Sequence, residues 1–257
     1  MERGEWTFLD TGENTGAYNM ELDESLARRL ASGESSPVLR LYRWKPWAIS
    51  LGHHQEASEI DEALCKRDGI DLLRRPTGGR AILHAEELTY SVVMKAGRRS
   101  ILQVYNDISQ ALVRGLAVYG VETSLEKSQP NFAKEYRTPN AVPCFSSSAR
   151  YEIEYRGRKL VGSAQRRLSD GDSDVVLQHG SILCGSAHVR LADYLSERAH
   201  REEIRTLLRE KTANLQEITG MTVDMARLTH SIRQGFEEAW QVRFRTGTQP
   251  HPHMALT

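Results

Sequence analysis

The most specific stretch of the chain reads Arg74-Arg-Pro-Thr-Gly-Gly-Arg-Ala-Ile-Leu-His84. A predicted strand over residues 70–75 leads into this stretch and ends at Pro76-Thr-Gly-Gly79. Extended structure resumes at Ala81. Paired glycines let backbone N–H groups approach a carbonyl or phosphate group closely. A glycine pair alone is more often a plain turn between strands, so its meaning depends on the rest of the chain.

Periodic apolar residues predict the helices. In the first, a tyrosine and three leucines recur every fourth residue from Tyr18 to Leu30, and Gly33 supplies a stop. Helices are expected over about residues 15–32, 58–67, 101–119, 189–196, 202–211 and 222–240. Those from about residue 189 onward are expected to form a helical C-terminal cap.

Short extended runs bounded by glycine, proline and polar residues predict the strands. They cover about residues 37–42, 47–51, 70–75, 81–83, 88–94, 121–125, 151–155, 159–167 and 175–183. The first two are expected to be adjacent antiparallel strands separated by Lys45-Pro46, and Arg156-Gly157 is expected to form a tight hairpin turn. We expect one domain over residues 1–248 and a flexible tail over 249–257.

Composition narrows the functional classes. The chain has 257 residues, with 34 basic and 34 acidic side chains, so it lacks the charge excess of a dedicated nucleic-acid binder. No apolar run approaches the length of a membrane span, so no membrane partner is expected. The N-terminus shows no secretion signal, which favours the cytoplasm and makes the three cysteines reduced thiols.

One of those cysteines stands out by its position. Cys144 follows Pro143 at the end of a polar stretch, residues 126–148, and loops longer than about 12 to 15 residues are usually functional or disordered. Lys159 arrives on the next predicted strand. A thiol in a polar loop with a nearby lysine is a plausible activated nucleophile, whereas Cys65 and Cys184 are interpreted as packing residues.

Taken in order, several stretches resemble one protein family. The Arg-Arg-x-x-Gly-Gly pattern at Arg74 resembles the signature of the lipoate and octanoate protein transferase and ligase family, which shares its catalytic domain with biotin protein ligases. Four further stretches resemble that family: Asn19-Met-Glu-Leu-Asp23, Trp47-Ala-Ile-Ser-Leu-Gly52 with Gln55, Gly157-Arg-Lys-Leu-Val-Gly-Ser-Ala164 and Gln178-His-Gly-Ser-Ile-Leu183. The resemblance extends from about Asn19 to Trp240, and the motifs occur in the same order as in the family.

Details of the motifs favour one branch of the family. ATP-dependent ligases usually carry a third glycine where this chain has Arg80, and an Asn-Asp pair where it has Arg150-Tyr151. Pro143-Cys-Phe with Tyr151-Glu-Ile instead resembles the cysteine-dependent octanoyltransferases of the Gram-positive type. One departure is Ala85, because many relatives have an aspartate after the histidine.

The resemblance implies an α/β (α+β) fold: a mixed, largely antiparallel β-sheet flanked by helices. It also implies transfer of an octanoyl group from octanoyl-acyl carrier protein to a lysine of a lipoyl domain, such as that of the glycine cleavage H protein. Cys144 would form the acyl-enzyme, and Lys159 would lower the pKa of its thiol and hold the acyl carbonyl. No ATP, metal or other cofactor is expected, because a thioester is already activated.

The same resemblance implies a set of substrate-binding residues. They are Arg75, Thr77, Gly78, Gly79, Arg80, His84, Gly162, Ser163, Ala164, His179 and Gly180. Ser163 is a candidate donor to the acyl carbonyl oxygen. Arg80 is a candidate contact for the phosphate of the carrier's phosphopantetheine arm.

Three other functions stay open at this point. An ATP-dependent lipoate-protein ligase would form lipoyl-AMP, an amidotransferase would take octanoate from the glycine cleavage H protein, and a non-catalytic relative would bind a lipoyl domain without forming an acyl-enzyme. Cys144 and the missing Asn-Asp pair argue against the first.

Overall fold

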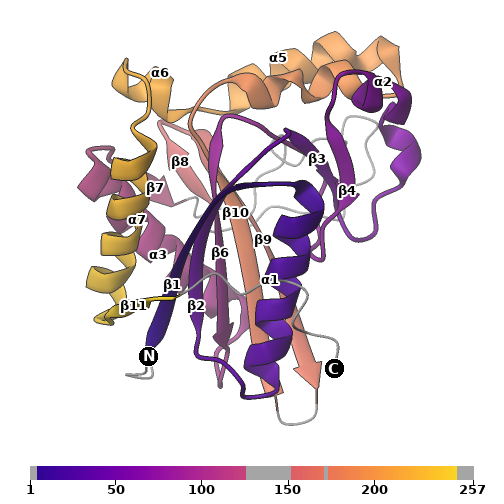
Figure 1. Cartoon of the computed structure of the whole chain (residues 1–257). Helices are drawn as coiled ribbons and strands as arrows, with labels where there is room; N and C mark the ends of the chain where they lie inside the picture. The colour runs from indigo at the N-terminus through magenta and orange to yellow at the C-terminus, as the bar shows by residue number, and fades with distance from the viewer. Residues whose placement is uncertain (1–4, 126–151, 171–172, 248–257) are drawn as a thin grey trace.

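The computed structural model describes residues 5–125, 152–170 and 173–247. In this part of the chain the expected sheet flanked by helices is present, and a second, smaller sheet lies beside it (Figure 1). Cys144, Arg150-Tyr151 and the expected tail lie outside the described residues.

The larger sheet is mixed and mostly antiparallel. Its strands, within the described ranges, are β1 (Trp6–Asn14), β2 (Val38–Trp44), β6 (Glu87–Lys95), β7 (Ser124–Leu125), β8 (Ile153–Tyr155), β9 (Arg158–Asp170), β10 (Ser173–Leu183) and β11 (Phe244–Thr246). They lie in the order β11-β1-β2-β6-β10-β9-β8-β7. β1 runs parallel to β2 and β11, and the other neighbouring pairs are antiparallel. The sequence patterns did not reveal β1 or β11.

The smaller sheet corrects one prediction. It consists of β4 (Asp71–Arg74), β3 (Ala48–Leu51) and β5 (Ile82–His84), with β3 in the middle. The expectation that residues 37–42 and 47–51 pair with each other is wrong. Both edges of β2 are occupied by β1 and β6, so after Lys45-Pro46 the chain leaves that sheet, and β3 pairs with β4 and β5 instead.

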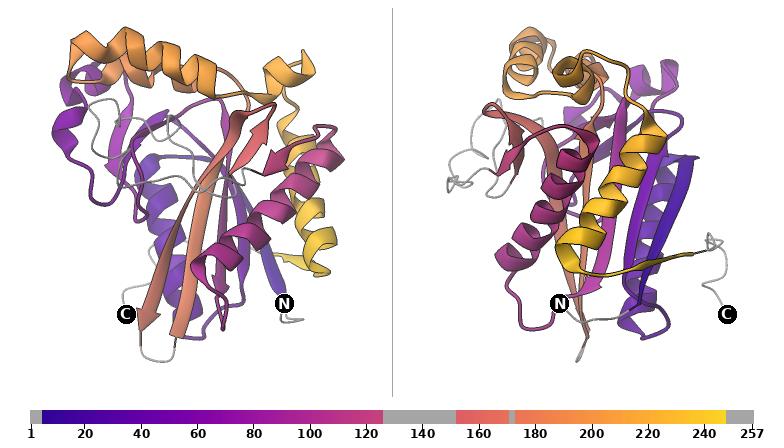
Figure 2. Two further views of the ribbon diagram at one scale, coloured as in Figure 1. Left: turned by 180° about the vertical axis from the view of Figure 1, so that it is seen from behind. Right: turned by 90° about the vertical axis from the view of Figure 1, so that its left-hand side faces the viewer.

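Helices cover both faces of the larger sheet (Figure 2). α1 (Gly16–Ala31) lies on one face, and α3 (Ile101–Tyr119) and α7 (Met225–Trp240) lie on the other. Val93 of β6 packs in a cluster with the leucines of α1, while its neighbour Val92 packs in the cluster that contains α3. Successive strand residues point to opposite faces, so both faces of this strand are buried.

The local signals that begin and end the helices are satisfied. Thr15 caps α1 by accepting a hydrogen bond from the backbone N–H of Tyr18, and Ser100 forms a capping box with Gln103 at the start of α3. Gly120 ends α3 with a φ of 101°, a conformation that glycine adopts readily. The Arg156-Gly157 turn is also confirmed, since both residues have positive φ.

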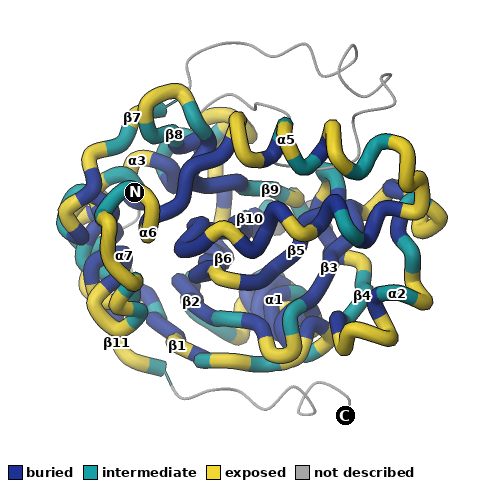
Figure 3. Tube along the Cα trace, turned by 90° about the horizontal axis from the view of Figure 1, so that it is seen from above, coloured by how far each residue is buried: buried dark blue, intermediate teal, exposed yellow. Residues whose placement is uncertain are grey.

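The remaining helical segments lie beside and above the two sheets. In the described part of the chain they are η1 (Ala57–Glu59), α2 (Glu62–Arg67), η3 (Ala187–Tyr194), η4 (Arg198–His200), α5 (Arg201–Lys211) and α6 (Leu215–Thr219). The segment expected as a helix over residues 189–196 is a 3₁₀ helix. Figure 3 shows the central strands buried inside this shell, with the exposed residues on its outer side.

Candidate active site

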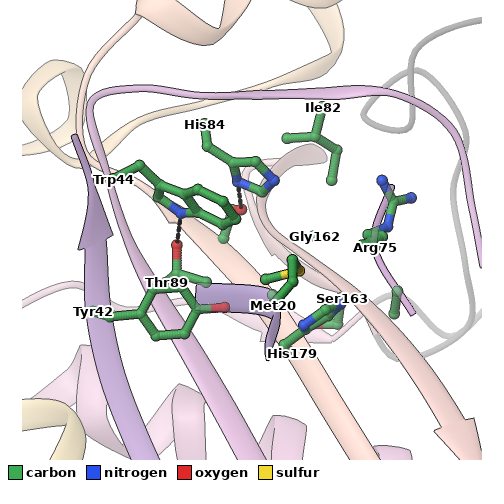
Figure 4. A pocket seen from close by; sticks show the side chains of 13 residues that line it. Met20, Tyr42, Trp44, Arg75, Ile82, His84, Thr89, Gly162, Ser163 and His179 are labelled. Carbon is green, nitrogen blue, oxygen red and sulfur yellow. Dashed lines mark hydrogen bonds between the residues drawn. The ribbon is translucent and has the colours of Figure 1, made fainter. Parts of the chain in front are cut away.

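A pocket lies where the two sheets meet (Figure 4), and we call it the central pocket. The cavity between its lining side chains has a volume of about 20 Å³. Some of the residues that the resemblance implies for substrate binding line it: Arg75, His84, Gly162, Ser163, Ala164, His179 and Gly180. The others in the lining are Met20, Tyr42, Trp44, Ile82, Thr89 and Ser181. A substrate-binding role for any of them stays a prediction.

The glycine-rich loop beside the pocket is folded around the guanidinium group of Arg75. This side chain is buried and donates to the carbonyl oxygens of Gly78 and Arg80, each at 2.8 Å, and to that of Ser50 at 2.9 Å. Gly79 has a φ of 93°, which favours glycine. The loop is therefore held by Arg75, which also brings a positive charge to the pocket.

Four predicted residues of this loop, Thr77, Gly78, Gly79 and Arg80, do not line the pocket. Thr77 is fully buried, and its hydroxyl contacts His179. Arg80 forms an ion pair with Glu59, with Nη1 3.2 Å from Oε1, and its side chain is one-fifth exposed. Its proposed contact with a phosphate stays a prediction.

His179 links the loop to the first helix. Its Nδ1 lies 3.2 Å from Oδ2 of Asp23, and its Nε2 lies 2.6 Å from Oγ1 of Thr77. Burial lowers the pKa of His179 and outweighs the opposite effect of Asp23, so the ring is neutral at pH 7. A neutral ring that donates from Nδ1 to the carboxylate accepts at Nε2 from the threonine hydroxyl.

Asp23 is fully buried but stays ionised. Burial alone would raise the pKa of Asp23, but Arg40, together with the contact to His179, lowers it further than burial raises it. Nη1 of Arg40 lies 2.7 Å from Oδ1 of Asp23, and the Tyr42 hydroxyl donates to Oδ2 at 3.0 Å. Arg40 also donates to the Asn19 side chain at 2.6 Å, so this network fixes α1 against the sheet.

His84 forms the opposite wall. Its Nδ1 lies 2.9 Å from Oε1 of Glu87, and its ring stacks on Trp44 with centroids 4.0 Å apart. The same Glu87 oxygen accepts from the hydroxyls of Thr89 and Ser181 at 2.6 and 2.7 Å. Because these polar groups bond to one another, the lining presents an almost wholly apolar surface to the cavity. Such a surface suits a saturated acyl chain.

The side chain of Ser163 is positioned by a hydrogen bond from Tyr90. The Tyr90 hydroxyl donates to Oγ of Ser163 at 2.6 Å and accepts from the Gln178 amide at 2.9 Å. Burial raises the pKa of Tyr90 to about 12, so its hydroxyl keeps its proton at any physiological pH. Ser163 accepts this bond with one lone pair and keeps its own proton for another acceptor.

Lys159 is buried on β9 and does not line the central pocket. Its Nζ forms an ion pair with Oε1 of Glu152 at 2.5 Å, and both side chains are about 95% buried. Cys144, its expected partner, lies outside the described residues. The sequence patterns singled out Lys159 but not the carboxylate beside it.

The other two cysteines are packing residues, as predicted. Cys65 and Cys184 are both buried in the main hydrophobic cluster. Burial raises the pKa of Cys65 to about 11 and that of Cys184 to about 12. Neither thiol forms a useful amount of thiolate at neutral pH.

No metal centre is seen in the described ranges, where no group of three or more His, Cys, Asp and Glu side chains is placed to hold an ion. The described helices also include none that is both long and apolar enough to cross a membrane.

Several residues that line the pocket or contact its lining were not named as site residues from the sequence. Met20 and Asp23 lie in the stretch 19–23 that resembles the family's opening helix, so a signal existed for them. Tyr42, Trp44 and Tyr90 lie in strands of ordinary apolar composition, where nothing marks one residue as part of a site.

Comparisons with known proteins agree on one family. The model of the lipoyl protein ligase A/B catalytic domain matches residues 15–237. Octanoyltransferase LipM of Kyrpidia tusciae is 38% identical over 251 residues, covering 94% of this chain and 89% of the relative. Octanoyltransferase LipM of Staphylococcus aureus is 32% identical, covering 93% and 88%.

Two solved structures show the same fold. A lipoate-protein ligase A bound with ATP superposes with a TM-score of 0.75 at 23% identity, covering 97% of this chain and 90% of that one. A bi-partite lipoate protein ligase from Thermoplasma acidophilum gives a TM-score of 0.73 at 22% identity, covering 96% and 88%.

Proposed function

Because the chain belongs to the lipoyl protein ligase A/B catalytic domain family, we propose that it is an octanoyltransferase that acts in protein lipoylation. The observation that carries this activity is the match, over nearly the whole chain, to relatives named octanoyltransferase. We further propose octanoyl-acyl carrier protein as the donor and a lipoyl-domain lysine, such as that of the glycine cleavage H protein, as the acceptor.

The lining of the central pocket is suited to an acyl substrate. Its inner surface is almost wholly apolar, and Gly162 and Ala164 present little or no side chain to it. The polar groups around it are bonded to one another, so an alkyl chain can bind there without leaving them unpaired once the lining side chains move apart to make room for it. We place the octanoyl chain there.

The proposed reaction has two acyl transfers. In the first, the Cys144 thiolate attacks the thioester carbonyl of the donor, a new C–S bond forms, and the carrier leaves as its thiol after taking up a proton. In the second, the neutral lysine amine attacks the acyl-Cys144 carbonyl, an amide forms, and the Cys144 thiol is released. No bond to adenylate is needed, because each step starts from a thioester.

Lys159 is proposed to favour the Cys144 thiolate. Lowering a thiol pKa from about 8.5 to about 7 takes roughly 2 kcal/mol, which one nearby cation can supply. Glu152 already neutralises the charge of Lys159 at long range. Lys159 would therefore act at short range, by donating a hydrogen bond to the sulfur or to the acyl carbonyl.

The test mixes the protein with octanoyl-acyl carrier protein and an apo lipoyl domain in the absence of ATP, and follows both proteins by intact mass. We expect an octanoyl adduct on the wild-type protein and then on the lipoyl domain. Cys144→Ser should abolish the transfer, whereas Cys65→Ala, which removes a packing thiol, should retain it.

The same assay separates the other functions. Transfer that needs ATP and passes through an acyl-adenylate would indicate a ligase. Faster transfer from octanoylated glycine cleavage H protein than from the carrier protein would indicate an amidotransferase. Transfer that survives in Cys144→Ser would refute the covalent route.

A further inference from the structure

A second cavity shares Trp44 with the central pocket, and we call it the acidic cavity. It is open to solvent and has a volume of about 480 Å³. Its charged lining consists of three carboxylates, Glu13, Glu86 and Glu87, and one cation, Arg43. Trp47, Val223 and Met225 form apolar parts of its wall. None of the described residues to which the resemblance assigns a catalytic or substrate-binding role lines this cavity.

The charges do not cancel. Nε of Arg43 lies 3.6 Å from Oε1 of Glu13, and Nζ of Lys45 lies 3.6 Å from Oε2, so Glu13 is paired with two cations. Glu86 and Glu87 are two further carboxylates, and in the described part of the chain neither forms an ion pair with a lysine or an arginine. Glu86 is positioned by the backbone N–H of Ala187, which donates to its Oε2 at 3.1 Å.

Gly185 permits this position of Glu86. A Cβ atom at residue 185 would lie 2.1 Å from Oε2 of Glu86, which is closer than any real contact.

Glu87 supplies an independent observation. Its residue surface is 2% exposed, and its Oε1 accepts from His84, Thr89 and Ser181. Its Oε2, in contrast, is buried and has no hydrogen-bond partner in the described part of the chain. Glu87 lines the acidic cavity and not the central pocket. A buried carboxylate oxygen left without a donor is costly unless a donor arrives from outside.

We propose that the acidic cavity binds the acceptor lysine as an alkylammonium group, an inference that rests on the proposed octanoyltransferase function. The methylene groups of the lysine pack against Trp47 and Met225, and the ammonium donates to Glu87, with Glu86 at the mouth. Glu87 Oε1 lies 2.9 Å from His84, which lines the central pocket, so the bound lysine is one side chain away from that pocket. Attack requires a neutral amine, so this is a docking site and not the place of reaction.

The test is a double-mutant cycle on binding. The unacylated protein and its Glu87→Gln variant are each titrated by calorimetry with an apo lipoyl domain and with the same domain carrying Met in place of its acceptor lysine. We expect the wild-type protein to prefer the lysine domain by roughly tenfold, and Glu87→Gln to bind both domains equally. Glu21→Gln, an exposed change of the same charge on α1, should keep the full preference.

An equal lysine preference in wild type and Glu87→Gln would overturn the proposal. If Glu87→Gln does not fold, Glu86→Gln takes its place in the same cycle. A lysine preference as large in Glu86→Gln as in the wild-type protein would then overturn the proposal. Acyl-enzyme formation from the octanoyl donor is measured in parallel. Its absence in the wild-type protein refutes the proposed function, whereas normal acylation with no loss of lysine preference refutes only the docking site.

Discussion

Lys159 is paired with a carboxylate, and this pairing determines how it can help a thiol. A buried Lys–Glu pair has little net charge, so its effect on a distant sulfur is weak and its effect at hydrogen-bond distance is strong. The role proposed for Lys159 therefore depends on direct contact with Cys144 or with the acyl group.

We predict that Lys159→Met slows acyl-enzyme formation at pH 7 by about tenfold, because the thiol pKa returns toward about 8.5. The rate should recover as the pH rises above that value. Single-turnover acylation followed by mass spectrometry from pH 6 to 10 measures both effects.

Two further variants make the Lys159 result specific. Lys95→Met, at an exposed strand end, is the control for a lost lysine. Lys159→Met combined with Glu152→Gln also removes the charge of the buried carboxylate that faces Lys159, so the double variant should be more stable than Lys159→Met alone while the rate stays low. An unshifted pH midpoint would argue against the proposed role.

Tyr90 is a positioning residue for Ser163, since it donates a hydrogen bond to that hydroxyl. Without this bond the serine is free to turn away from the acyl carbonyl. Tyr90→Phe should therefore reduce the rate of acyl-enzyme formation by about tenfold with little change in the KM of the donor.

The double variant tells positioning from damage to the fold. If Tyr90 acts through Ser163, Tyr90→Phe causes no further loss in a Ser163→Ala background. Losses that multiply in the double variant would mean that Tyr90 acts independently of the serine.

The contact between α3 and α7 depends on two glycines. A Cβ atom at Gly235 would lie 2.2 Å from the backbone nitrogen of Gly115, and one at Gly115 would lie 2.8 Å from Cα of Ile232. Backbone atoms cannot yield as a flexible side-chain end does. The two helices therefore approach each other only because neither position carries a side chain.

Gly235→Ala should consequently reduce the free energy of unfolding by about 1 to 3 kcal/mol, the usual cost of overpacking, even though alanine favours helix more than glycine does. Urea denaturation measures it. Ala226→Ser, at an exposed position of the same helix, should change the free energy of unfolding by less than about 0.5 kcal/mol. Equal stability of Gly235→Ala and wild type would show that the helices separate without cost.

The stability of the whole molecule should depend on pH through its buried histidines. Burial lowers the pKa of His188 to about 4 and also lowers that of His179. An unfolded histidine takes up a proton below about pH 6.5, whereas folded His188 stays neutral down to about pH 4. The folded state therefore loses stability as the pH falls through this window, by roughly 3 kcal/mol for His188 alone.

Urea denaturation between pH 7.5 and 4 measures this loss. His188→Gln should flatten the pH dependence, because the amide does not titrate, and His230→Gln on the exposed side of α7 is the control. Stability that stays constant over the window would contradict the neutral state of the buried rings.

Long helices and the hairpin were predictable because their signals are local. These signals are the apolar residues at every fourth position of α1, the apolar periodicity of α3 and the Arg156-Gly157 turn, and each depends only on residues that are close together in the sequence. The pairing of β3 was not predictable in this way, because it depends on β1 and β6 already occupying the edges of β2.

The sequence by itself determined the family, and through it the fold and the position of the glycine-rich loop. It could do so because the family's motifs occur in the same order along nearly the whole chain, so the identification does not depend on any single contact. Only the tertiary structure decided which polar groups pair. Asp23 meets His179 across 156 residues, and Tyr90 meets Ser163 across 73 residues. Such pairs arise where strands and helices pack, and local spacing carries no information about residues so far apart. The same packing decided that the chemically specific Arg74–His84 stretch closes around Arg75 and borders an apolar pocket.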